Sequence, residues 1–266
     1  MSQLVAPPST TTSTSLGTLP IPLHQQLETW LAQRQQEFYL HQQAGTTNTK
    51  ALRPFVTLSY AQSLDGSISM NSQEALALSG SESCQLTHQL RSFHQGILVG
   101  IGTVLADDPL LTVRHCTGTS PQPIVLDSQL RIPPSARLCQ RSDARCWVLT
   151  TQVDSGKLGA NVEVLTLDGN GRVNLRDALA LLWQRGIRSL MVEGGGEVIT
   201  SFLQQQMADA IVLTVAPTLV GGYKSVGDLG KTCKSQLPRI KALQSQALGG
   251  DLMVWGDLHY QAPAHS

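Results

Sequence analysis

The sequence has no surplus of charge of either sign and no long apolar run. Its 266 residues include 19 lysines and arginines and 19 aspartates and glutamates, so the formal net charge is zero. A protein that binds nucleic acid through its phosphates needs a basic excess. No apolar run approaches the ~20 residues that cross a bilayer, and the N-terminus lacks a basic segment followed by an apolar one. We therefore expect no nucleic-acid partner, no membrane contact, no signal peptide and a cytoplasmic protein.

The sequence also lacks several patterns that would indicate a metal site or a catalytic nucleophile. An odd number of cysteines without CxxC spacing favours a reducing compartment and argues against a structural zinc site, so no metal is predicted. The H-x-E and P-C-x-x-C pair of zinc deaminases is missing, as is the G-x-S-x-G elbow of serine hydrolases. The five cysteines are Cys84, Cys116, Cys139, Cys146 and Cys233.

What is present divides into a polar N-terminus and a folded domain. Residues 1–20 are rich in Ser, Thr and Pro and have few apolar groups, which predicts a disordered tail. Residues 21–52 are predicted to form an amphipathic helix, packed on the domain edge or on a partner chain, and a polar linker. The hydrophobic content of 41% supports a sizeable core, and residues 53–262 are expected to form one domain. The apolar residues of the helix recur at helical spacing, at Leu23, Leu27, Trp30, Leu31 and Phe38.

Predicted strands alternate with predicted helices along this domain. Strands are indicated by short apolar runs at 54–60, 97–99, 123–127, 146–150, 162–167, 189–193 and 210–216, with a terminal strand pair at 252–255 and 258–260. Helices are indicated at 79–93, with Ser79 or Ser81 as N-cap, at 174–186, with Asn174 as N-cap, and at 197–203. The alternation predicts an α/β fold with a mostly parallel sheet.

One stretch, residues 96–114, places several functional residue types close together. It reads GILVGIGTVLADDPLLTVR, so a buried strand is followed by a glycine turn, two adjacent carboxylates, a proline and Arg114. In open α/β sheets, ligands bind beyond the carboxyl ends of the strands. The residue types alone leave two interpretations open. The stretch is either part of a binding site or an acidic surface loop that stops at Pro109.

A second candidate is the triple glycine at 194–196, between a predicted strand and a predicted helix. Free backbone N–H groups at a helix N-terminus favour phosphate, although a tight strand–helix crossover would also favour glycine. The pattern matches neither G-x-G-x-x-G nor a phosphate loop. Glu193, directly before it, is either a hydrogen-bonded turn residue or a ligand contact. Arg91, near the end of a predicted helix, is either a ligand contact or a cation that complements the helix dipole.

A series of short motifs, taken in order, resembles a known family. They are PFVTL (54–58), AQSLDG (61–66), LALSG (76–80), THQLR (87–91), GILVG (96–100), GTVLADDP (102–109), VLDS (125–128) and VEGG (192–195). The order resembles the pyrimidine reductases of riboflavin biosynthesis, which comprise the reductase part of bacterial RibD and its stand-alone fungal and archaeal relatives. The resemblance covers about residues 53–260.

The resemblance implies a dihydrofolate-reductase-like fold, a homodimer and NADPH as the hydride donor. It also implies a ribosylaminopyrimidine 5′-phosphate as substrate, whose ring-opened imine accepts hydride at C1′ of the ribose. Asp107 or Glu193 would steer the proton that reaches the imine nitrogen. By position in the motifs, the substrate contacts would be Arg91, Leu111, Arg114 and Glu193. The NADPH contacts would be Ala61, Thr103, Asp107, Ser128, Gly195, Gly196, Glu197, Val198, Ile199, Thr200 and Ser201.

One departure from the family separates two subtypes. The fused bacterial enzymes carry Gly-Glu-Ser-x-Trp where this chain has QEALA at 73–77, so the chain resembles the stand-alone type. The departure also motivates an alternative, a related reductase for another phosphorylated or pterin-like compound. A non-catalytic homologue that binds a nucleotide or a partner is a further alternative. Ser128 and Arg131 are the candidates for holding the 2′-phosphate of NADPH.

Overall fold

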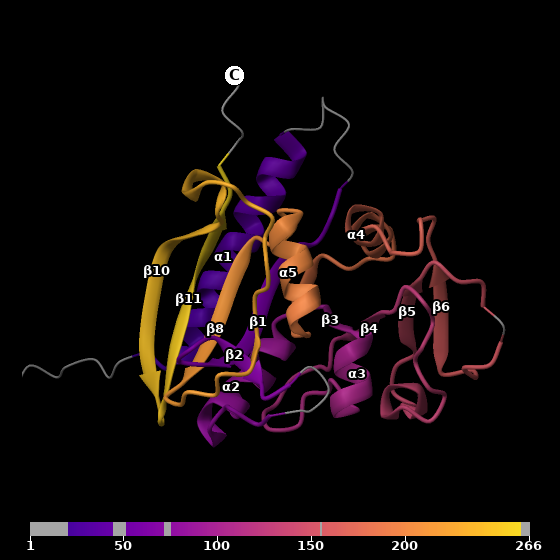
Figure 1. The fold of residues 1–266 in the computed structure, drawn as a ribbon, viewed down its shortest axis with the longest axis horizontal. Helices are drawn as coiled ribbons and strands as arrows, with labels where there is room; N and C mark the ends of the chain where they lie inside the picture. Colours follow the sequence, from indigo (N-terminus) through magenta and orange to yellow (C-terminus); the bar gives the residue numbers. More distant parts are fainter. Residues whose placement is uncertain (1–20, 45–51, 72–75, 155, 262–266) are drawn as a thin grey trace, which may run out of the picture.

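The computed structural model describes residues 21–44, 52–71, 76–154 and 156–261. The expected N-terminal tail, most of the expected linker and residues 73–75 of the family departure at 73–77 lie outside these residues. The described chain forms a large sheet with helices on both faces (Figure 1), as the alternating pattern predicts. Among the helices that these residues form, none has both the length and the apolar character to cross a membrane.

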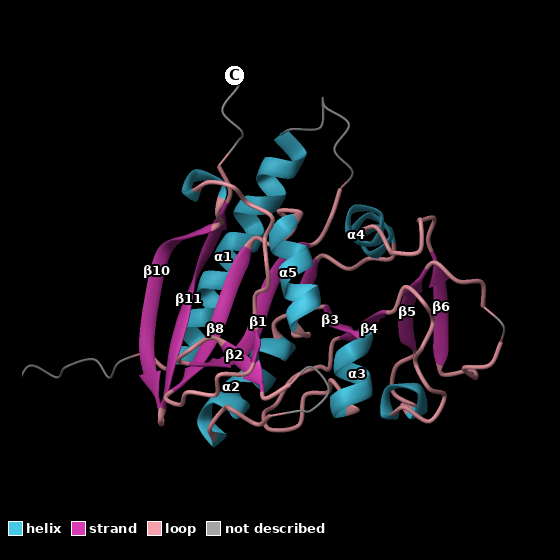
Figure 2. Ribbon diagram, in the orientation of Figure 1, coloured by secondary structure: helices cyan, strands magenta, loops and turns pink. Residues whose placement is uncertain are grey.

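The central sheet has nine strands in the order β10-β11-β8-β1-β7-β3-β4-β5-β6. The strands from β8 to β6 run parallel, β11 runs antiparallel to β8, and β10 pairs antiparallel with β11 at the edge (Figure 2). The strands are β1 Phe55–Ser63, β3 Gly96–Gly100, β4 Gln122–Leu126, β5 Cys146–Thr150, β6 Val162–Thr166, β7 Ser189–Val192, β8 Ala210–Ala216, β10 Arg239–Leu248 and β11 Asp251–His259. A separate two-stranded sheet joins β2 Ser67–Ser69 to β9 Tyr223–Lys224.

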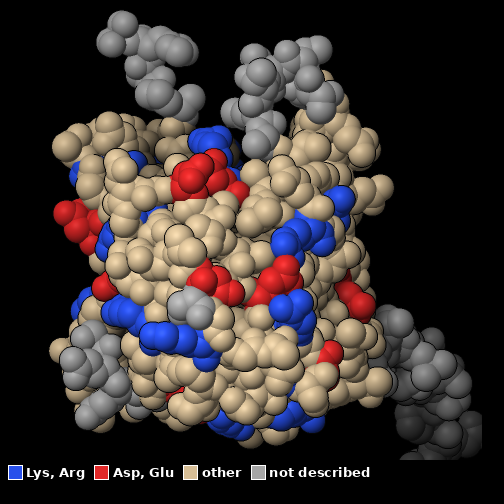
Figure 3. All heavy atoms as spheres, turned by 90° about the vertical axis from the view of Figure 1, so that its right-hand side faces the viewer, with Lys and Arg blue, Asp and Glu red and all other residues tan. Residues whose placement is uncertain are grey.

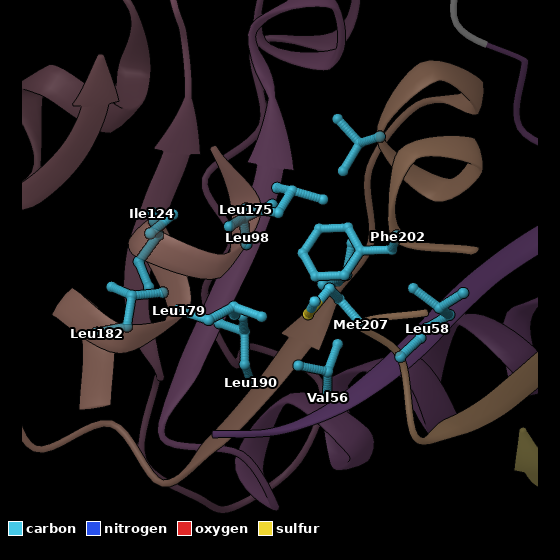
Figure 4. Close-up of a cluster of buried hydrophobic side chains, with 14 of the residues drawn as sticks. Val56, Leu58, Leu98, Ile124, Leu175, Leu179, Leu182, Leu190, Phe202 and Met207 are labelled. Carbon is cyan, nitrogen blue, oxygen red and sulfur yellow. The ribbon is translucent and has the colours of Figure 1, made fainter. Parts of the chain in front are cut away.

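The helices bury opposite faces of this sheet because side chains alternate along each strand. Leu98 packs beneath α4 and α5, whereas Ile97 and Val99 pack on the other face beside α3. Figure 4 shows Phe202 of α5 above Val56, with Leu182 of α4 beside Ile124. The helices are α1 Leu23–Ala44, α2 Ser81–Ser92, α3 Ile101–Asp107, α4 Leu175–Gln184 and α5 Gly196–Gln204, with 3-10 turns η1 Arg137–Gln140 and η2 Lys234–Gln236.

The N-terminal helix packs on its own chain. Leu27 and Leu31 of α1 are almost fully buried, in a cluster with Phe55 of β1 and Trp255 of β11. Burying a leucine side chain contributes roughly 1.5–3 kcal/mol, so this face anchors α1 to the sheet. The sequence left open whether this helix packs on the domain edge or on a partner chain, and the structure shows it on the domain edge.

Three details of the predicted elements are wrong. The chain does not turn after Gly102 but enters α3 directly at Ile101, whose side chain is buried with that of Val104. The N-cap of α2 is Gly80, whose N–H donates to Asp251 Oδ2 at 2.8 Å, and no serine side chain caps this helix. The capping of α4 by Asn174 is confirmed, since its Oδ1 accepts from the next backbone N–H groups at 2.9 and 3.4 Å.

The third error concerns the C-terminal strands. Residues 251–259 form one continuous strand, β11, instead of a strand pair. Its partner β10 was not predicted. Nearly all of its side chains are exposed, so its sequence has no alternation of apolar and polar residues. On the face at the β5–β6 end, acidic and basic side chains are interspersed, in keeping with the zero net charge (Figure 3).

Candidate active site

The two candidate stretches lie against each other at the carboxyl edge of the sheet. Strands β7 and β3 are parallel neighbours, with Val192 in register with Leu98. The N–H of Glu193 donates to the carbonyl of Leu98 at 3.0 Å. The two segments therefore leave the sheet side by side. The one after β3 enters α3, and the one after β7 enters the turn at residues 194–196, which we call the glycine turn. This is the edge at which ligands of open α/β sheets bind.

Glycine is required at this junction for two reasons. A Cβ on Gly194 would lie 2.7 Å from the Cα of Val99, which no larger residue can tolerate. Gly195 has a φ of +54°, in the left-handed region that favours glycine. A Cβ there would also lie 3.2 Å from Thr103 Oγ1. The turn thus places the N-terminus of α5 directly beside Thr103 of α3.

The first turn of α5 offers backbone N–H groups and few side chains. Val198 and Ile199 are buried in the core, and their N–H groups both donate to the carbonyl of Gly195 at 3.1 Å. Within the described residues, the N–H groups of Gly196 and Glu197 have no acceptor. A helix leaves such donors at its first positions. These two N–H groups are therefore free to bind an anion.

Further along α5, two predicted residues are engaged within the protein. Thr200 Oγ1 accepts from the N–H of Gly227 at 2.8 Å. Ser201 Oγ donates to the carbonyl of Glu197 at 2.7 Å. Both hydroxyls therefore stabilise the helix and the loop that covers it.

Asp107 lies one helical turn after Thr103, on the same side of α3. Its side chain is exposed and has no hydrogen-bond or ion-pair partner among residues that the structure describes. Partial desolvation raises the pKa of this carboxyl above its usual range. Its neighbour Asp108 is structural, because it closes α3 in a left-handed conformation and accepts from the N–H of Arg137 at 2.8 Å.

Arg91 and Glu193 form a two-pronged ion pair. Arg91 Nε donates to Glu193 Oε1 at 2.6 Å, and Nη2 donates to Oε2 at 2.8 Å. Both side chains are nearly buried, with exposures of 11% and 13%. Burial lowers the pKa of Arg91, but the Glu193 carboxylate offsets this and leaves it raised. Forked pairs of this kind fix orientation as well as charge.

Thr112 connects this pair to the second arginine. Its carbonyl accepts from Arg91 Nη1 at 2.9 Å, and its Oγ1 accepts from Arg114 Nη1 at 2.9 Å. Arg114 is exposed, so it is the more available cation for a ligand. Leu111 has a φ of +53° and is 1% exposed, which places its side chain in the core instead of a cleft.

The remaining predicted cofactor residues lie at the ends of neighbouring strands. Ala61 is half-buried near the end of β1, in register with Thr214 of β8. Ser128 follows β4, and its Oγ accepts from the N–H of Val173 at 3.0 Å. Arg131 is 58% exposed, with Nε 3.9 Å from Asp127 Oδ1. These residues lie at the same edge of the sheet as the glycine turn.

Asp127, which the sequence analysis did not single out, is fully buried at the end of β4. Burial raises the pKa of its carboxyl. Its Oδ2 accepts from the N–H of Ile132 at 2.8 Å, which shapes the loop that carries Ser128 and Arg131. The signal in the sequence was the VLDS motif, in which a carboxylate follows a buried strand.

Asp65, which the sequence shows only as part of the AQSLDG motif, connects two loops through its hydrogen bonds. Hydrogen bonds to its carboxylate hold the pKa of Asp65 far below the usual range, and the bond from Lys224 has the largest effect. Its carbonyl also accepts from Lys224 Nζ at 2.8 Å. Its carboxylate accepts, at 2.5 to 2.9 Å, from Ser63 Oγ, Ser67 Oγ, Val220 N, Gly221 N and Lys224 Nζ.

This network reaches the glycine turn through β9. A Cβ on Gly196 would lie 2.6 Å from the carbonyl oxygen of Lys224 and 3.0 Å from Tyr223 Cε1. The loop that Asp65 holds therefore packs directly on the N-terminus of α5. The partners of Asp65 in this loop are about 155 residues away in sequence, so no local pattern predicts them.

Comparison with known proteins matches this architecture to one family. The model of the RibD C-terminal domain matches residues 54–254. Riboflavin biosynthesis protein RibD of Aquifex aeolicus is 36% identical over 207 residues, which are 76% of this chain and 57% of that protein. The 2,5-diamino-6-ribosylamino-4(3H)-pyrimidinone 5′-phosphate reductase of Archaeoglobus fulgidus is 37% identical over 187 residues, which are 65% of this chain and 85% of that protein.

Solved structures give the same result. RibD of Acinetobacter baumannii superposes with a TM-score of 0.69 at 27% identity, covering 78% of this chain and 58% of that one. The Saccharomyces riboflavin biosynthesis reductase Rib7 superposes with a TM-score of 0.65 at 28% identity, covering 80% and 94%. The chain thus spans little more than half of the RibD proteins. The dihydrofolate-reductase-like fold is confirmed, and the chain belongs to the RibD C-terminal domain family.

Proposed function

We propose that this protein is an NADPH-dependent reductase that converts a ribosylaminopyrimidine 5′-phosphate to the ribitylaminopyrimidine 5′-phosphate. The family and the names of its relatives support this activity. The observation that carries it is that hydrogen bonds join the glycine turn to the loop with Arg114, since Glu193 pairs with Arg91 and Arg91 donates to the carbonyl of Thr112. Free N–H groups of α5 suit a cofactor diphosphate, and the loop with Arg114 offers a cation for a substrate phosphate.

The residues at the glycine turn fit a dinucleotide. Gly194 and Gly195 admit no side chain without a clash or strain, so the backbone there stays open to close approach. The N–H groups of Gly196 and Glu197 would bind the diphosphate, with Thr103 Oγ1 beside them. Ala61 and Ser128 would contact the cofactor from the ends of β1 and β4. When bound, the nicotinamide supplies the hydride.

The substrate would lie over Arg91 and Glu193. The ion pair with Glu193 uses two of the five N–H groups of Arg91, and the hydrogen bond to Thr112 uses a third. Arg91 therefore acts mainly as a fixed platform, a rigid surface on which the substrate is positioned. Arg114, which has one side-chain hydrogen bond and an exposed side chain, would take the phosphate. Aligning the imine with the nicotinamide is the main catalytic contribution of such a platform.

Of the two acids considered for the proton, Asp107 is better suited. Both oxygens of Glu193 accept from Arg91, which leaves that carboxylate poorly disposed to carry a proton. Asp107 has no partner among the described residues and has a raised pKa, the direction that prepares a carboxyl for proton transfer near neutral pH. We therefore assign the proton to Asp107 and the positioning of the substrate to Glu193.

We also propose that the protein is a homodimer, as the family resemblance implies. Strand β10 supports this proposal, because its outer edge pairs with no other strand of the described chain. Exposed edges of this length are commonly covered, and Ile240 and Leu243 are exposed on it. Sedimentation or mass photometry would give twice the chain mass if the proposal is correct and the chain mass if it is wrong.

The proposed activity is tested by steady-state turnover. Purified protein is mixed with NADPH or NADH and with the aminated or the deaminated pyrimidine, and nicotinamide absorbance is followed. We expect oxidation of NADPH with at least one of the two pyrimidines. Binding of NADPH without oxidation in the presence of either pyrimidine would contradict the proposal and favour a non-catalytic homologue.

A further inference from the structure

Three side chains with metal-binding atoms converge beside the proposed substrate loop. Cys84 and His88 lie one turn apart on the same face of α2, and His115 follows Arg114. One ligand atom from each residue lies within 4.8 Å of the other two. In the described parts of the chain, this is the one group of three or more such residues that meets this geometry.

The spacing is close to that of a tetrahedral site. Zinc bound to one thiolate and two imidazoles holds its ligand atoms roughly 3.4–3.6 Å apart, from bond lengths of about 2.3 and 2.0–2.1 Å. Closing the group to that spacing requires movements of about 1 Å, which exposed side chains on a helix and a loop can make. Cys84 and His115 are both exposed, so each is free to adjust.

The central ligand, His88, is buried, and its Nδ1 accepts from the backbone N–H of Arg114. The rings of His88 and His115 are perpendicular, with centroids 4.5 Å apart.

We propose that Cys84, His88 and His115 form a binding site for a zinc-class divalent cation, with water completing the coordination. One thiolate and two imidazoles are borderline-soft ligands, which select zinc, cobalt or copper over magnesium or calcium. Neither neighbouring arginine blocks the site, because Arg91 is paired with Glu193 and the Cys84 thiolate balances one cationic charge. The expectation of no metal rested on the absence of CxxC, a pattern that this cluster does not use.

Occupation of the site would change the contact between His88 and Arg114. The backbone N–H of Arg114 donates to His88 Nδ1 at 3.1 Å. If the metal takes Nδ1, it replaces this hydrogen bond directly. If the metal takes Nε2, the remaining proton moves to Nδ1, which then repels the Arg114 N–H. In both cases the loop that carries Arg114 must shift, so the cation would weaken binding of the phosphorylated substrate.

Cobalt is the probe that tests the site without any turnover. Metal-free, reduced full-length protein is titrated with Co²⁺ while the thiolate-to-cobalt absorption in the near ultraviolet is recorded. We expect this band to saturate at one cobalt per chain and to vanish on addition of Zn²⁺. Cys84→Ser should abolish the band, and His115→Gln should weaken binding at least tenfold. Both positions are exposed, so neither variant threatens folding.

Cys233→Ser is the matched control, because Cys233 is also exposed and its hydrogen bond with Ser235 lowers its thiol pKa. This variant should keep the full cobalt signal. The proposal is wrong if no band forms, if the band survives in Cys84→Ser, or if it disappears in Cys233→Ser.

A second readout rests on the proposed function. Saturating Zn²⁺ should raise the KM for the phosphorylated pyrimidine at least threefold in the wild type and leave it unchanged in Cys84→Ser. Unchanged kinetics in a protein that binds cobalt would contradict the coupling to Arg114. A protein that binds cobalt but turns over no pyrimidine would instead contradict the proposed function, so the two failures are distinguishable.

Discussion

At the scale of single residues, the proposed site contains side chains that are bonded within the protein and side chains that are free to contact a ligand. Arg91 pairs with Glu193 and donates to the carbonyl of Thr112, and these bonds hold the three residues in place. Arg114 and Asp107 are exposed and make few or no side-chain contacts within the described chain. Substitutions of these two should therefore change kinetics while leaving stability nearly intact.

Arg114→Ala tests the phosphate contact. A hydrogen bond to a charged group contributes roughly 1.5–3 kcal/mol, so we expect the KM for the phosphorylated pyrimidine to rise at least tenfold with a small change in kcat. Arg114→Lys keeps the charge but loses the fork and should give an intermediate KM. Wild-type kinetics in both variants would remove Arg114 from the substrate site.

Asp107→Asn tests the proton transfer. The amide has nearly the same shape but cannot carry the proton, and general acid–base catalysis contributes typically about 10²–10⁴-fold. We expect kcat to fall by about that factor while the melting temperature stays within a degree or two. Asp108→Ala is the control, because it removes the carboxylate that accepts from the N–H of Arg137 and places alanine in a left-handed conformation, so it should lower stability instead. An unchanged kcat in Asp107→Asn would return this carboxylate to the surface-loop interpretation.

At the scale of elements, the loop that Asp65 holds packs on the N-terminus of α5, which is the proposed binding site for the cofactor diphosphate. Asp65→Ala removes the acceptor of five donors and should loosen β9 against Gly196. We expect weaker NADPH binding, measured by titration of intrinsic fluorescence, with a smaller effect on the KM for the pyrimidine. If NADPH affinity is unchanged, the network serves stability alone.

Local patterns predicted the elements but not the pairs between them. The strands β1, β3, β4, β5, β7 and β8 have apolar runs, and each was predicted within a few residues. Strand β10 has none, because its exposed side chains leave only the pairing with β11 to define it. Likewise, the motifs pointed to Arg91 and Glu193 as ligand contacts. Their ion pair with each other, 102 residues apart, required the three-dimensional structure.

At the scale of the whole molecule, a buried histidine links stability to pH. His94 is buried between α2 and β1, where Nδ1 contacts the carbonyl of Leu90 at 2.7 Å and Nε2 contacts Thr57 Oγ1 at 2.9 Å. Burial lowers its pKa from 6.5 to about 4. Between these values the unfolded chain binds a proton that the folded chain does not, so stability falls as the pH falls.

The lowered pKa of His94 predicts that the folded state loses stability as the pH falls from about 6.5 to about 4. The contribution is constant above about pH 6.5 and declines by at most about 1.4 kcal/mol per pH unit down to about pH 4. Urea unfolding at several pH values should show this slope in the wild type and in His41→Gln, whose histidine is exposed. The slope should be shallower in His94→Gln. Identical slopes in all three proteins would exclude His94 as the cause.

In the proposed reaction, the two loops at the sheet edge hold a nicotinamide against the ribose carbon of the pyrimidine. The most direct measurement follows the hydride itself, using NADPH dideuterated at C4 of the nicotinamide and nuclear magnetic resonance of the product. We expect one deuterium at C1′ of the ribityl chain. A reduced product without deuterium at C1′, or no reduced product at all, would contradict it.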